Sequence, residues 1–347
     1  MTHMTWHAGP YPFPLFPHMP AALPLSIGID VSKKELVCAV RYRHHVQHIT
    51  KTNTKAGIRA LDNRFKRCAC PIIMESTGRY HFLPALLLSE QGYDIRIVNP
   101  IMTKRYMRGS VRNIKSDPTD AAALAHMALL DLKLPAPFND TMSDIALRQK
   151  IGFLSKLEKK LQSLHMMQRE YEAVCVLCST ELSAAEIDMK EQISYLSRTQ
   201  ERLAEEIEAL VCSDDAMKRR VELLITIPGM SRGLATILCA CLSTECTHPK
   251  QWIAFVGLDV TVRQSGNWKG RGRLSKRGHP YLRKRLYSAA WGAQMNDEVF
   301  ATEYRKLREA GRTYREAIVI LARKILRIAF AVCKKEQPYE RKTSSAC

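Results

Sequence analysis

The first residues whose types and spacing could do chemistry are two acids at the start of an expected helix. Asp117 lies three residues before Asp120, Pro118 stands between them, and an alanine-rich segment follows up to Ala125. Proline is tolerated in a first helical turn and residues three apart share a helix face, so both carboxylates should project together near the helix N-terminus. Such a pair could be half of a metal site. Acids in a first turn also cap a helix and complement its dipole, so a structural role is equally compatible with this segment.

Two further acids close short apolar segments. The segments are 26–31 (SIGIDV) and 71–75 (PIIME), which place Asp30 and Glu75 at the carboxyl ends of two expected strands. An acid inside an apolar strand is costly unless it is paired or bound to a cation. Strands alternate with helices over residues 25–135, which predicts an α/β domain that binds ligands at the carboxyl ends of its strands.

If the two strands are neighbours and the Asp117 helix packs across their ends, four carboxylates converge: Asp30, Glu75, Asp117 and Asp120. Four uncompensated acids would repel one another, so a divalent cation is the expected partner, and hard oxygen ligands favour Mg²⁺. Two ions about 3.5–4 Å apart can stabilise both the attacking and the leaving oxygen of a phosphoryl transfer.

The overall charge indicates a polyanionic partner. The chain of 347 residues has 53 Lys plus Arg against 34 Asp plus Glu, a formal net charge of +19. Such an excess favours nucleic acid, because cations that neutralise phosphates release counterions. Together with the four acids, it predicts a metal-dependent enzyme that acts on nucleic acid.

The segment 260–296 contains no Asp or Glu. Its glycines predict a flexible loop in the first half, Trp268 could stack on a base, and the cations could bind phosphates. The expected nucleic-acid contacts are Arg263, Trp268, Lys269, Arg271, Arg273, Ser275, Lys276 and Arg277, and further cations follow at Arg283, Lys284 and Arg285.

The rest of the chain predicts the domain organisation. Residues 1–24 contain six prolines and should form a disordered leader. The α/β domain over 25–135 is followed by a helical hairpin or coiled coil over 143–212, because apolar residues recur there at three- and four-residue spacing. A mostly helical C-terminal domain over 219–335 and a frayed tail over 336–347 complete the chain.

Two features of the helical part have alternative interpretations. The charged runs around Glu158 and around Glu206 are expected to be solvated faces, and a role in dimerisation or RNA support is the alternative. Residues 224–235 resemble a helix-hairpin-helix, whose glycine turn could present N–H groups to a phosphate. Ser231 stands where a second glycine is usual, so a purely packing hairpin is equally compatible.

Four segments resemble, in this order along the chain, the DEDD-type insertion-sequence transposases: Ile27-Gly-Ile-Asp30-Val-Ser-Lys, Glu75-Ser-Thr-Gly78-Arg-Tyr, Val98-Asn-Pro100 and Lys115-Ser-Asp117-Pro-Thr-Asp120-Ala. The resemblance extends from about residue 26 to residue 335. It implies a RuvC-like, ribonuclease-H-type catalytic domain, followed by the helical hairpin and a C-terminal transposase domain. It also implies DNA donor and target partners, guidance by a structured RNA, and a homo-oligomer, dimer or tetramer, in which half-sites combine between subunits.

The segment Arg263-Gln-Ser265-Gly266 resembles the serine-bearing motif of the same family's C-terminal domain. By this resemblance, Ser265 is the nucleophile that attacks a DNA phosphate and holds the broken strand covalently. No His is adjacent, so the metal site is the expected activator. Ser275 is the competing candidate, and we expect it instead to cap a helix over 281–293.

Membrane insertion and secretion are not expected. The sequence has no apolar run of about 18 residues and no basic segment followed by an apolar one at its start, which predicts a cytoplasmic protein. The eleven cysteines are therefore expected to be reduced thiols. Cys175 and Cys178 have metal-ligand spacing, but no second pair follows, so a structural zinc site is not expected.

Two rival functions stay open at this stage. One is a RuvC-like junction nuclease that uses metal-activated water, with Ser265 only structural. The other is a catalytically silent nucleic-acid-binding remnant of an inactivated element. The presence of all four acids argues against the second.

Overall fold

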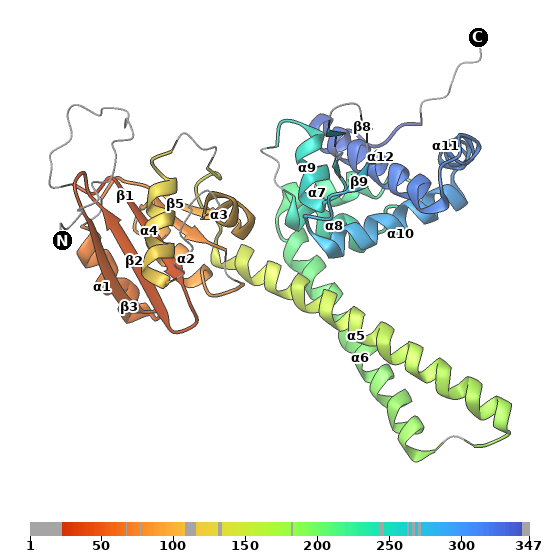
Figure 1. The fold of residues 1–347 in the computed structure, drawn as a ribbon. Helices are drawn as coiled ribbons and strands as arrows, with labels where there is room; N and C mark the ends of the chain where they lie inside the picture. Colours follow the sequence, from red (N-terminus) through yellow and green to blue (C-terminus); the bar gives the residue numbers. More distant parts are fainter. Residues whose placement is uncertain are drawn as a thin grey trace, which may run out of the picture. The chain divides into compact units, whose positions relative to one another are not determined.

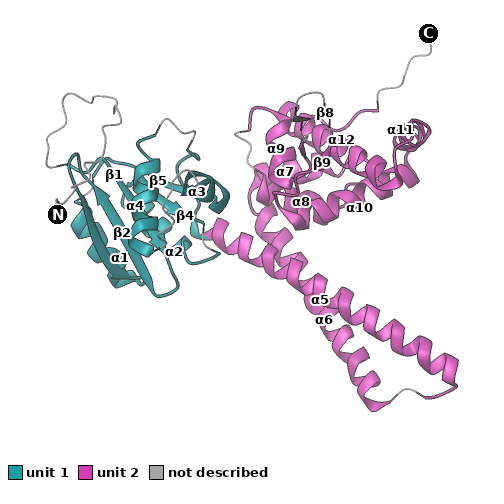
Figure 2. Ribbon diagram, viewed as in Figure 1, with its two compact units in different colours: residues 1–142 teal, residues 143–347 magenta. Residues whose placement is uncertain are grey.

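The computed structural model describes residues 23–66, 68–76, 78–107, 116–130, 134–181, 183–242, 246–261, 264–265, 268–269 and 272–341 (Figure 1). At residues 264, 265, 268 and 269 it describes the backbone alone. The chain divides into two compact units, residues 1–142 and 143–347 (Figure 2). Residues 1–22 of the expected leader lie outside the described residues.

Unit 1 is built on a five-stranded sheet. Its strands are β1 (Ser26–Val31), β2 (Glu35–Arg41), β3 (Val46–Thr52), β4 (Ile72–Glu75) and β5 (Ile95–Val98), in the order β3-β2-β1-β4-β5. The first three form an antiparallel meander, whereas β4 runs parallel to β1 and β5 runs parallel to β4. Strands β1 and β4 are therefore neighbours, as the expected convergence of the acids requires.

Helices cover both faces of this sheet (Figure 1). They are α1 (Lys55–Phe65), α2 (Phe82–Glu90), α3 (Pro100–Met107) and α4 (Asp117–Met127). On one face, Ile29 of β1 shares a core with Ile58 of α1 and Leu88 of α2. Helix α4 packs on the other face. Because successive side chains of a strand point to opposite faces, Gly28 and Asp30 face α4.

Unit 2 is almost entirely helical. Its helices are α5 (Met142–Cys178), α6 (Ala184–Cys212), α7 (Asp215–Leu224), α8 (Arg232–Cys241), α9 (Pro249–Val256), α10 (Pro280–Asn296), α11 (Glu298–Glu309) and α12 (Tyr314–Lys335). One core cluster joins the start of α5 and the end of α6 to the later helices, with Ile151, Ile207 and Leu286 among its buried side chains. A mixed sheet domain followed by a helical region confirms the predicted fold class.

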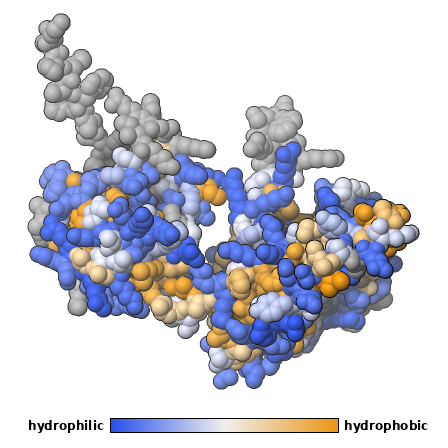
Figure 3. Space-filling model, turned by 90° about the horizontal axis from the view of Figure 1, so that it is seen from below, coloured by the Kyte–Doolittle hydropathy of each residue, from blue (hydrophilic) through white to orange (hydrophobic). Residues whose placement is uncertain are grey.

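Helices α5 and α6 form the expected hairpin, which extends from the rest of unit 2 (Figure 2). Leu157, Leu161 and Ile193 make a second, smaller core along it. Near the C-terminal end of α5 the apolar side chains are no longer covered by the facing helix. Val176 and Leu177 there are 79% and 83% exposed. The face drawn in Figure 3 is largely hydrophilic, with apolar side chains gathered in a few places.

Part of the glycine-rich segment after α9 is ordered, where a flexible loop was expected. Its described backbone forms two short antiparallel ladders, β6 (Val260–Thr261) with β9 (Arg273–Leu274), and β7 (Gln264–Ser265) with β8 (Trp268–Lys269). Strands of two residues leave no periodicity in a sequence, which is why the pattern indicated only a loop.

The end of the chain differs from the expected frayed tail. The backbone N–H of Tyr339 donates to Thr226 Oγ1 at 2.8 Å, and Arg341 pairs with the buried Asp297 at 2.9 Å. Residues 336–341 therefore pack back onto unit 2, and residues 342–347 lie outside the described residues.

The helix-hairpin-helix-like turn lies between α7 and α8. Gly229 has a left-handed backbone with φ +79°, and a methyl group there would overlap the Ala289 carbonyl oxygen and lie 2.9 Å from Ala293 Cβ. The glycine face of this turn therefore packs against α10, which favours the packing interpretation.

No helix of the described residues is long and apolar enough to cross a membrane.

Candidate active site

Helix α4 lies unusually close to strand β1, and two contacts fix its direction. The buried Ser26 hydroxyl donates to the Ala125 carbonyl oxygen at 2.7 Å. Gly28, two residues farther along β1, faces the helix so closely that a methyl group would overlap Ala121 O and Ala125 N and lie 2.8 Å from Leu124 Cβ. Moving up the strand therefore means moving back down the helix, so the N-terminus of α4 lies at the carboxyl end of β1.

This register brings the predicted acids together. Two residues of strand span about 6.6 Å and four residues of helix about 6 Å, so the step from Gly28 to Asp30 matches the step from Ala121 to Asp117. In the sheet, Ile29 of β1 pairs with Met74 of the parallel strand β4. The next residues along these strands are Asp30 and Glu75, so the two acids lie at neighbouring positions of adjacent strands. Glu75 alternates with Met74, which belongs to the α1/α2 core, and therefore points to the α4 face.

Electrostatics link all four carboxylates. The pKa of Asp30 is raised, first by burial and then by the negative charges of Asp117, Asp120 and Glu75, while a hydrogen bond with the Val31 backbone opposes the shift. Asp117 is exposed, whereas the other three acids are half-buried. Asp30 therefore lies within electrostatic range of the other three acids, although the four come from positions up to 90 residues apart.

Residues other than the two acids cap the start of α4. The N-cap of α4 is Ser116, whose backbone N–H donates to Thr119 Oγ1 at 3.0 Å, and the Thr119 hydroxyl donates back to the Ser116 carbonyl at 2.7 Å. Asp117 and Asp120 are therefore not needed as caps. The partial positive charge of the helix N-terminus still favours acids there, and it would also favour any anion held nearby.

The donor set fits a divalent cation in its chemistry. Four carboxylates offer only hard oxygen ligands, which Mg²⁺ and similar ions prefer. In the described part of the chain, however, no three acid, His or Cys side chains lie close enough together to hold a metal ion. Mutual repulsion among the four charges favours this wider spacing, since each acid raises the energy of the others.

A polar cluster at the other end of α4 escaped the sequence reasoning. The Tyr106 hydroxyl of α3 is hydrogen-bonded to His126 Nδ1 of α4. Burial, and then the charge of Arg41, lowers the pKa of His126. These residues are separated by 20 to 85 positions and follow no shared period, so no sequence signal could have joined them. The cluster ties α3 to the end of α4 opposite the acids.

In unit 2, Ser265 lies on β7, whose ladder with β8 is nested between β6 and β9, and these four strands are called the Ser265 arm. The base of this arm is closed by Ser275, whose backbone N–H donates to the Asp259 carbonyl at 2.9 Å and whose hydroxyl donates to the Asp259 carboxylate. The expectation that Ser275 caps α10 is wrong, because His279 is the N-cap and accepts from the Leu282 N–H at 3.3 Å.

The structure describes the side chains of only some predicted nucleic-acid contacts. Arg273, Lys276 and Arg277 are exposed, next to the half-buried Ser275. Arg263 and Arg271 lie outside the described residues, as do the side chains of Ser265, Trp268 and Lys269.

The later cations of this segment have protein partners. Arg283 donates to the Val256 carbonyl at 2.9 Å and Lys284 to Gln162 at 3.3 Å, while Arg285 pairs with Glu158. The cations of α10 therefore help to hold unit 2 together, whereas Arg273, Lys276 and Arg277 are exposed and can reach a phosphate.

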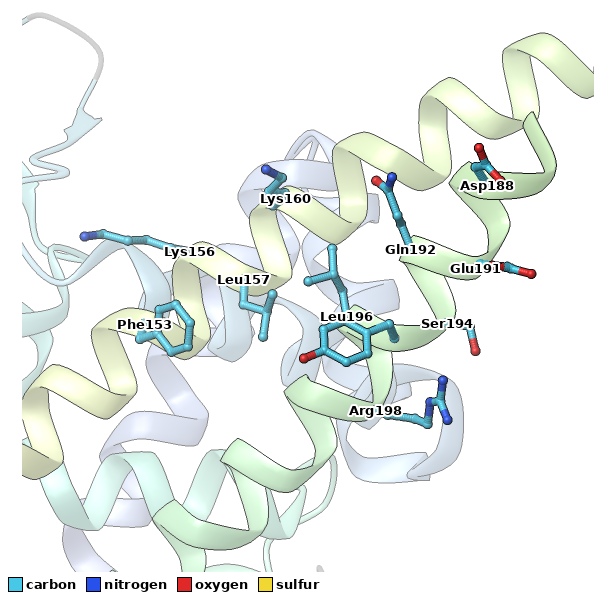
Figure 4. Close-up of a pocket in the computed structure, with 11 residues that line it drawn as sticks. Phe153, Lys156, Leu157, Lys160, Asp188, Glu191, Gln192, Ser194, Leu196 and Arg198 are labelled. Carbon is cyan, nitrogen blue, oxygen red and sulfur yellow. The ribbon is translucent and has the colours of Figure 1, made fainter. Parts of the chain in front are cut away.

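A groove of about 1030 Å³ lies between α5 and α6 (Figure 4). Phe153 and Tyr195 line it together with Lys156, Lys160 and Arg198. It contains no candidate catalytic residue.

Comparisons with known proteins give matches in both units. A DEDD-type IS110 family model, described as "Transposase", matches residues 27–171, which include the four acids. A second model, described as "Transposase IS116/IS110/IS902 family", matches residues 221–305, which include Ser265. A DEDD domain of this kind indicates the use of a divalent metal ion.

Whole-length relatives agree with these matches. Pilin gene-inverting proteins of Moraxella bovis and Moraxella lacunata are each 23% identical over 329 residues, covering 91% of this chain and 98% of the relative. A probable family 20 transposase of Pseudomonas aeruginosa is 22% identical over 289 residues, covering 76% of this chain and 82% of the relative. The chain belongs to the IS110 family of insertion-sequence transposases, enzymes that act on DNA.

Proposed function

We propose that this transposase exchanges DNA strands through a Mg²⁺-dependent reaction in which Ser265 becomes covalently linked to DNA, and that a structured RNA guides it. The observation that carries the proposal is the register of α4 on β1, which turns Asp117 and Asp120 toward the strand ends of Asp30 and Glu75. Four acids around one edge of the sheet repel one another without a cation, so a metal-dependent role would explain why the fold places them there.

Each acid has a distinct place in this arrangement. Asp30 and Glu75 sit on neighbouring rigid strands, which fixes their separation, and Asp117 and Asp120 close the site from the helix start. Two Mg²⁺ ions bound there would supply stabilisation of the attacking and leaving oxygens. The four carboxylates would hold and orient these ions. The partial positive charge at the N-terminus of α4 would also attract the DNA phosphate.

The Ser265 step conserves atoms and charge. A bond forms between Ser265 Oγ and the DNA phosphorus as the hydroxyl proton leaves, and the bond from phosphorus to the departing deoxyribose oxygen breaks, with that oxygen taking up a proton. The exposed Arg273, Lys276 and Arg277 supply positive charge close to the arm in the chain. Positive charge of this kind stabilises the developing charge on the phosphoryl oxygens.

Strand exchange is favoured over hydrolysis by the relatives. Two of them are named pilin gene-inverting proteins, and inversion requires that every broken end be rejoined. A covalent serine link keeps the energy of the broken bond available for rejoining, whereas water would lose it. Guidance by RNA and assembly into a dimer or tetramer rest on the family resemblance, and the net charge of +19 is compatible with both DNA and RNA partners.

The test uses a suicide DNA substrate, in which cleavage releases a short end so that rejoining fails. The full chain is purified with its associated RNA and incubated with this DNA and Mg²⁺, and the covalent adduct is measured on a denaturing gel. We expect an adduct with the wild type that is lost with Ser265→Ala, with Asp30→Asn, with a chelator, or after ribonuclease treatment. Ser275→Ala should still form it, because that hydroxyl is bonded to Asp259.

The rival functions predict different results. Cleavage without any adduct, retained in Ser265→Ala, would establish the junction nuclease. An Asp30→Asn variant that keeps every activity of the wild type would support the catalytically silent remnant.

A folding control accompanies the Asp30→Asn variant. It should unfold at an equal or higher denaturant concentration than the wild type in the absence of metal, because one of four repelling charges is removed. Loss of activity in this variant would therefore not reflect loss of folding.

A further inference from the structure

Two cysteines lie side by side where the chain enters strand β4. Cys68 and Cys70 are separated by one residue, and the Cys70 thiol donates to the Cys68 sulfur at an Sγ–Sγ distance of 3.1 Å. Cys70 is buried in the core of unit 1, while Cys68 is half-buried. The backbone N–H of Cys68 donates to the Phe65 carbonyl at 3.1 Å, which holds the first cysteine in place at the end of α1.

This pair differs from the thiols of Cys38, Cys239 and Cys241. Burial raises the pKa of Cys38 and of Cys239 to about 12, and that of Cys241 to about 11, so these thiols are inert near neutral pH. The hydrogen bond from Cys70 instead lowers the pKa of Cys68 to about 7, while the pKa of Cys70 is raised by that bond and by burial. Cys68 is thus the activated member and Cys70 the protonated one.

Metal binding does not explain the pair. Among the described residues, no third His, Cys, Asp or Glu side chain joins the two sulfurs at metal-holding distance. Structural sites for soft metals need four ligands, commonly from two such pairs. The chemistry that remains for two adjacent sulfurs, one of them partly accessible, is exchange with another disulfide.

We propose that Cys68 and Cys70 form a reversible thiol–disulfide site, in which Cys68 attacks a low-molecular-weight disulfide and Cys70 resolves the mixed disulfide. In the first step the Cys68 thiolate bonds to one sulfur of the small disulfide, and the other sulfur leaves as a thiolate. Cys70 then loses its proton and attacks the Cys68 sulfur, which expels the second small thiol. The two protein thiols are oxidised by two electrons, and one small disulfide is reduced to two thiols.

The location of the pair allows a disulfide to form without displacing strand β4. The pair stands at the end of the connection from α1 to β4, and β4 ends in Glu75. The sulfurs need to close by only about 1 Å to reach a disulfide bond length, so the ring can form without moving the core strand.

The test follows one tryptic peptide of the full-length protein. Cleavage after Arg67 and after Arg79 gives peptide 68–79, which contains only these two cysteines. The reduced protein is incubated with oxidised glutathione, quenched with acid, alkylated in denaturant, digested and analysed by mass spectrometry. We expect peptide 68–79 to lose the mass of two hydrogen atoms, to carry neither alkyl group nor glutathione, and to regain both alkylation sites after dithiothreitol.

Matched variants assign the two roles. In Cys70→Ala, Cys68 should retain glutathione as a stable adduct, because the resolving thiol is absent. In Cys68→Ala, peptide 68–79 should carry one alkyl group and no glutathione. Peptide 170–190 is the internal control, since its Cys175 thiol donates to Glu186 at 3.6 Å and not to Cys178, and it should carry two alkyl groups throughout.

The pH profile is a second readout. Alkylation of Cys68 in the native wild type should be half-maximal near pH 7. In Cys70→Ala the donor is gone and the pKa returns toward the ordinary value, so alkylation at pH 7 should slow by at least about tenfold. Two alkyl groups on wild-type peptide 68–79 after the incubation with oxidised glutathione would overturn the proposal. A glutathione adduct that persists on wild-type Cys68 would also overturn it.

Discussion

Gly28 determines how close the acid-bearing helix comes to the acid-bearing strand. It has no side chain to hold α4 away, and the backbone of Ala121 and Ala125 occupies the space that a methyl group would need. The neighbouring Ser26 then anchors the helix through its bond to Ala125. The glycine is therefore a positioning residue of the site, although it makes no contact with a substrate or a metal.

Replacing Gly28 by Ala should separate the two halves of the acid cluster. The added methyl group collides with helix backbone that has no flexible end to move aside, so we expect a loss of about 3 kcal/mol in the free energy of unfolding of unit 1. The DNA adduct should be lost as well, since Asp117 and Asp120 move away from the strand ends. Denaturant unfolding and the suicide-substrate assay measure the two effects.

Gly152→Ala is the matched control for this change. Gly152 lies inside α5 with nothing within 4 Å of an added methyl group, so the same substitution should stabilise the helix by about 0.5–1 kcal/mol. Equal behaviour of the two variants would contradict the close approach of α4 and β1.

At the residue scale, the sequence predicts the acids better than the contacts that bring them together. Asp30 and Glu75 could be found because each follows an apolar run at an expected strand end, which is a local pattern. The bond from Ser26 to Ala125 spans 99 residues and involves a backbone carbonyl, so no pattern of residue types announces it. The placement of α4 therefore had to be assumed from the sequence and was supplied by the structure.

At the scale of elements, the long hairpin is fastened to the C-terminal helices by a clamp that the sequence misplaced. Glu158 of α5 was expected on a solvated face, yet its side chain is only 14% exposed and pairs with Arg285 of α10. The Tyr281 hydroxyl also donates to Glu158 at 2.7 Å. A charged run in one helix predicts exposed side chains. Glu158 is instead partly buried because α10, more than 120 residues later in the chain, packs against it.

Removing this clamp should loosen α5 from α10. Glu158→Ala leaves the Arg285 charge and the Tyr281 hydroxyl half-buried without their acceptor, so we expect a loss of about 2–3 kcal/mol in the free energy of unfolding of unit 2. Glu206→Ala is the control, because Glu206 is 57% exposed in its pair with Lys150 and should change stability little. Urea unfolding of both variants tests this, and an equal loss would show that the clamp is not buried enough to matter.

Elements differed in how well the sequence predicted them. The 37 residues of α5 and 29 of α6 were found from their apolar spacing, because long helices repeat their pattern many times. The eight-residue helices α3 and α9 each complete only two turns after an initial proline, and they were missed. The ladders of the Ser265 arm were missed for the same reason, since two residues carry no period.

At the scale of the whole molecule, the proposed chemistry is divided between the two units. The four acids belong to unit 1, and the arm with Ser265 belongs to unit 2. Each unit has its own core, so a variant in one unit should leave the fold of the other intact. This separation allows the two halves of the proposed reaction to be inactivated independently.

A mixture of two inactive variants should therefore regain activity if the halves combine between subunits. Asp30→Asn keeps the serine and Ser265→Ala keeps the acids, so a mixed dimer contains one site with both groups intact only when the acids of one subunit act with the serine of the other. Co-expression should then restore roughly a quarter of the wild-type adduct, since half of randomly paired dimers are mixed and each has one competent site of two. Adduct formation from the co-purified mixture measures this, with each variant alone as the blank. No recovery, in a preparation shown to contain mixed oligomers, would mean that acids and serine act within one chain.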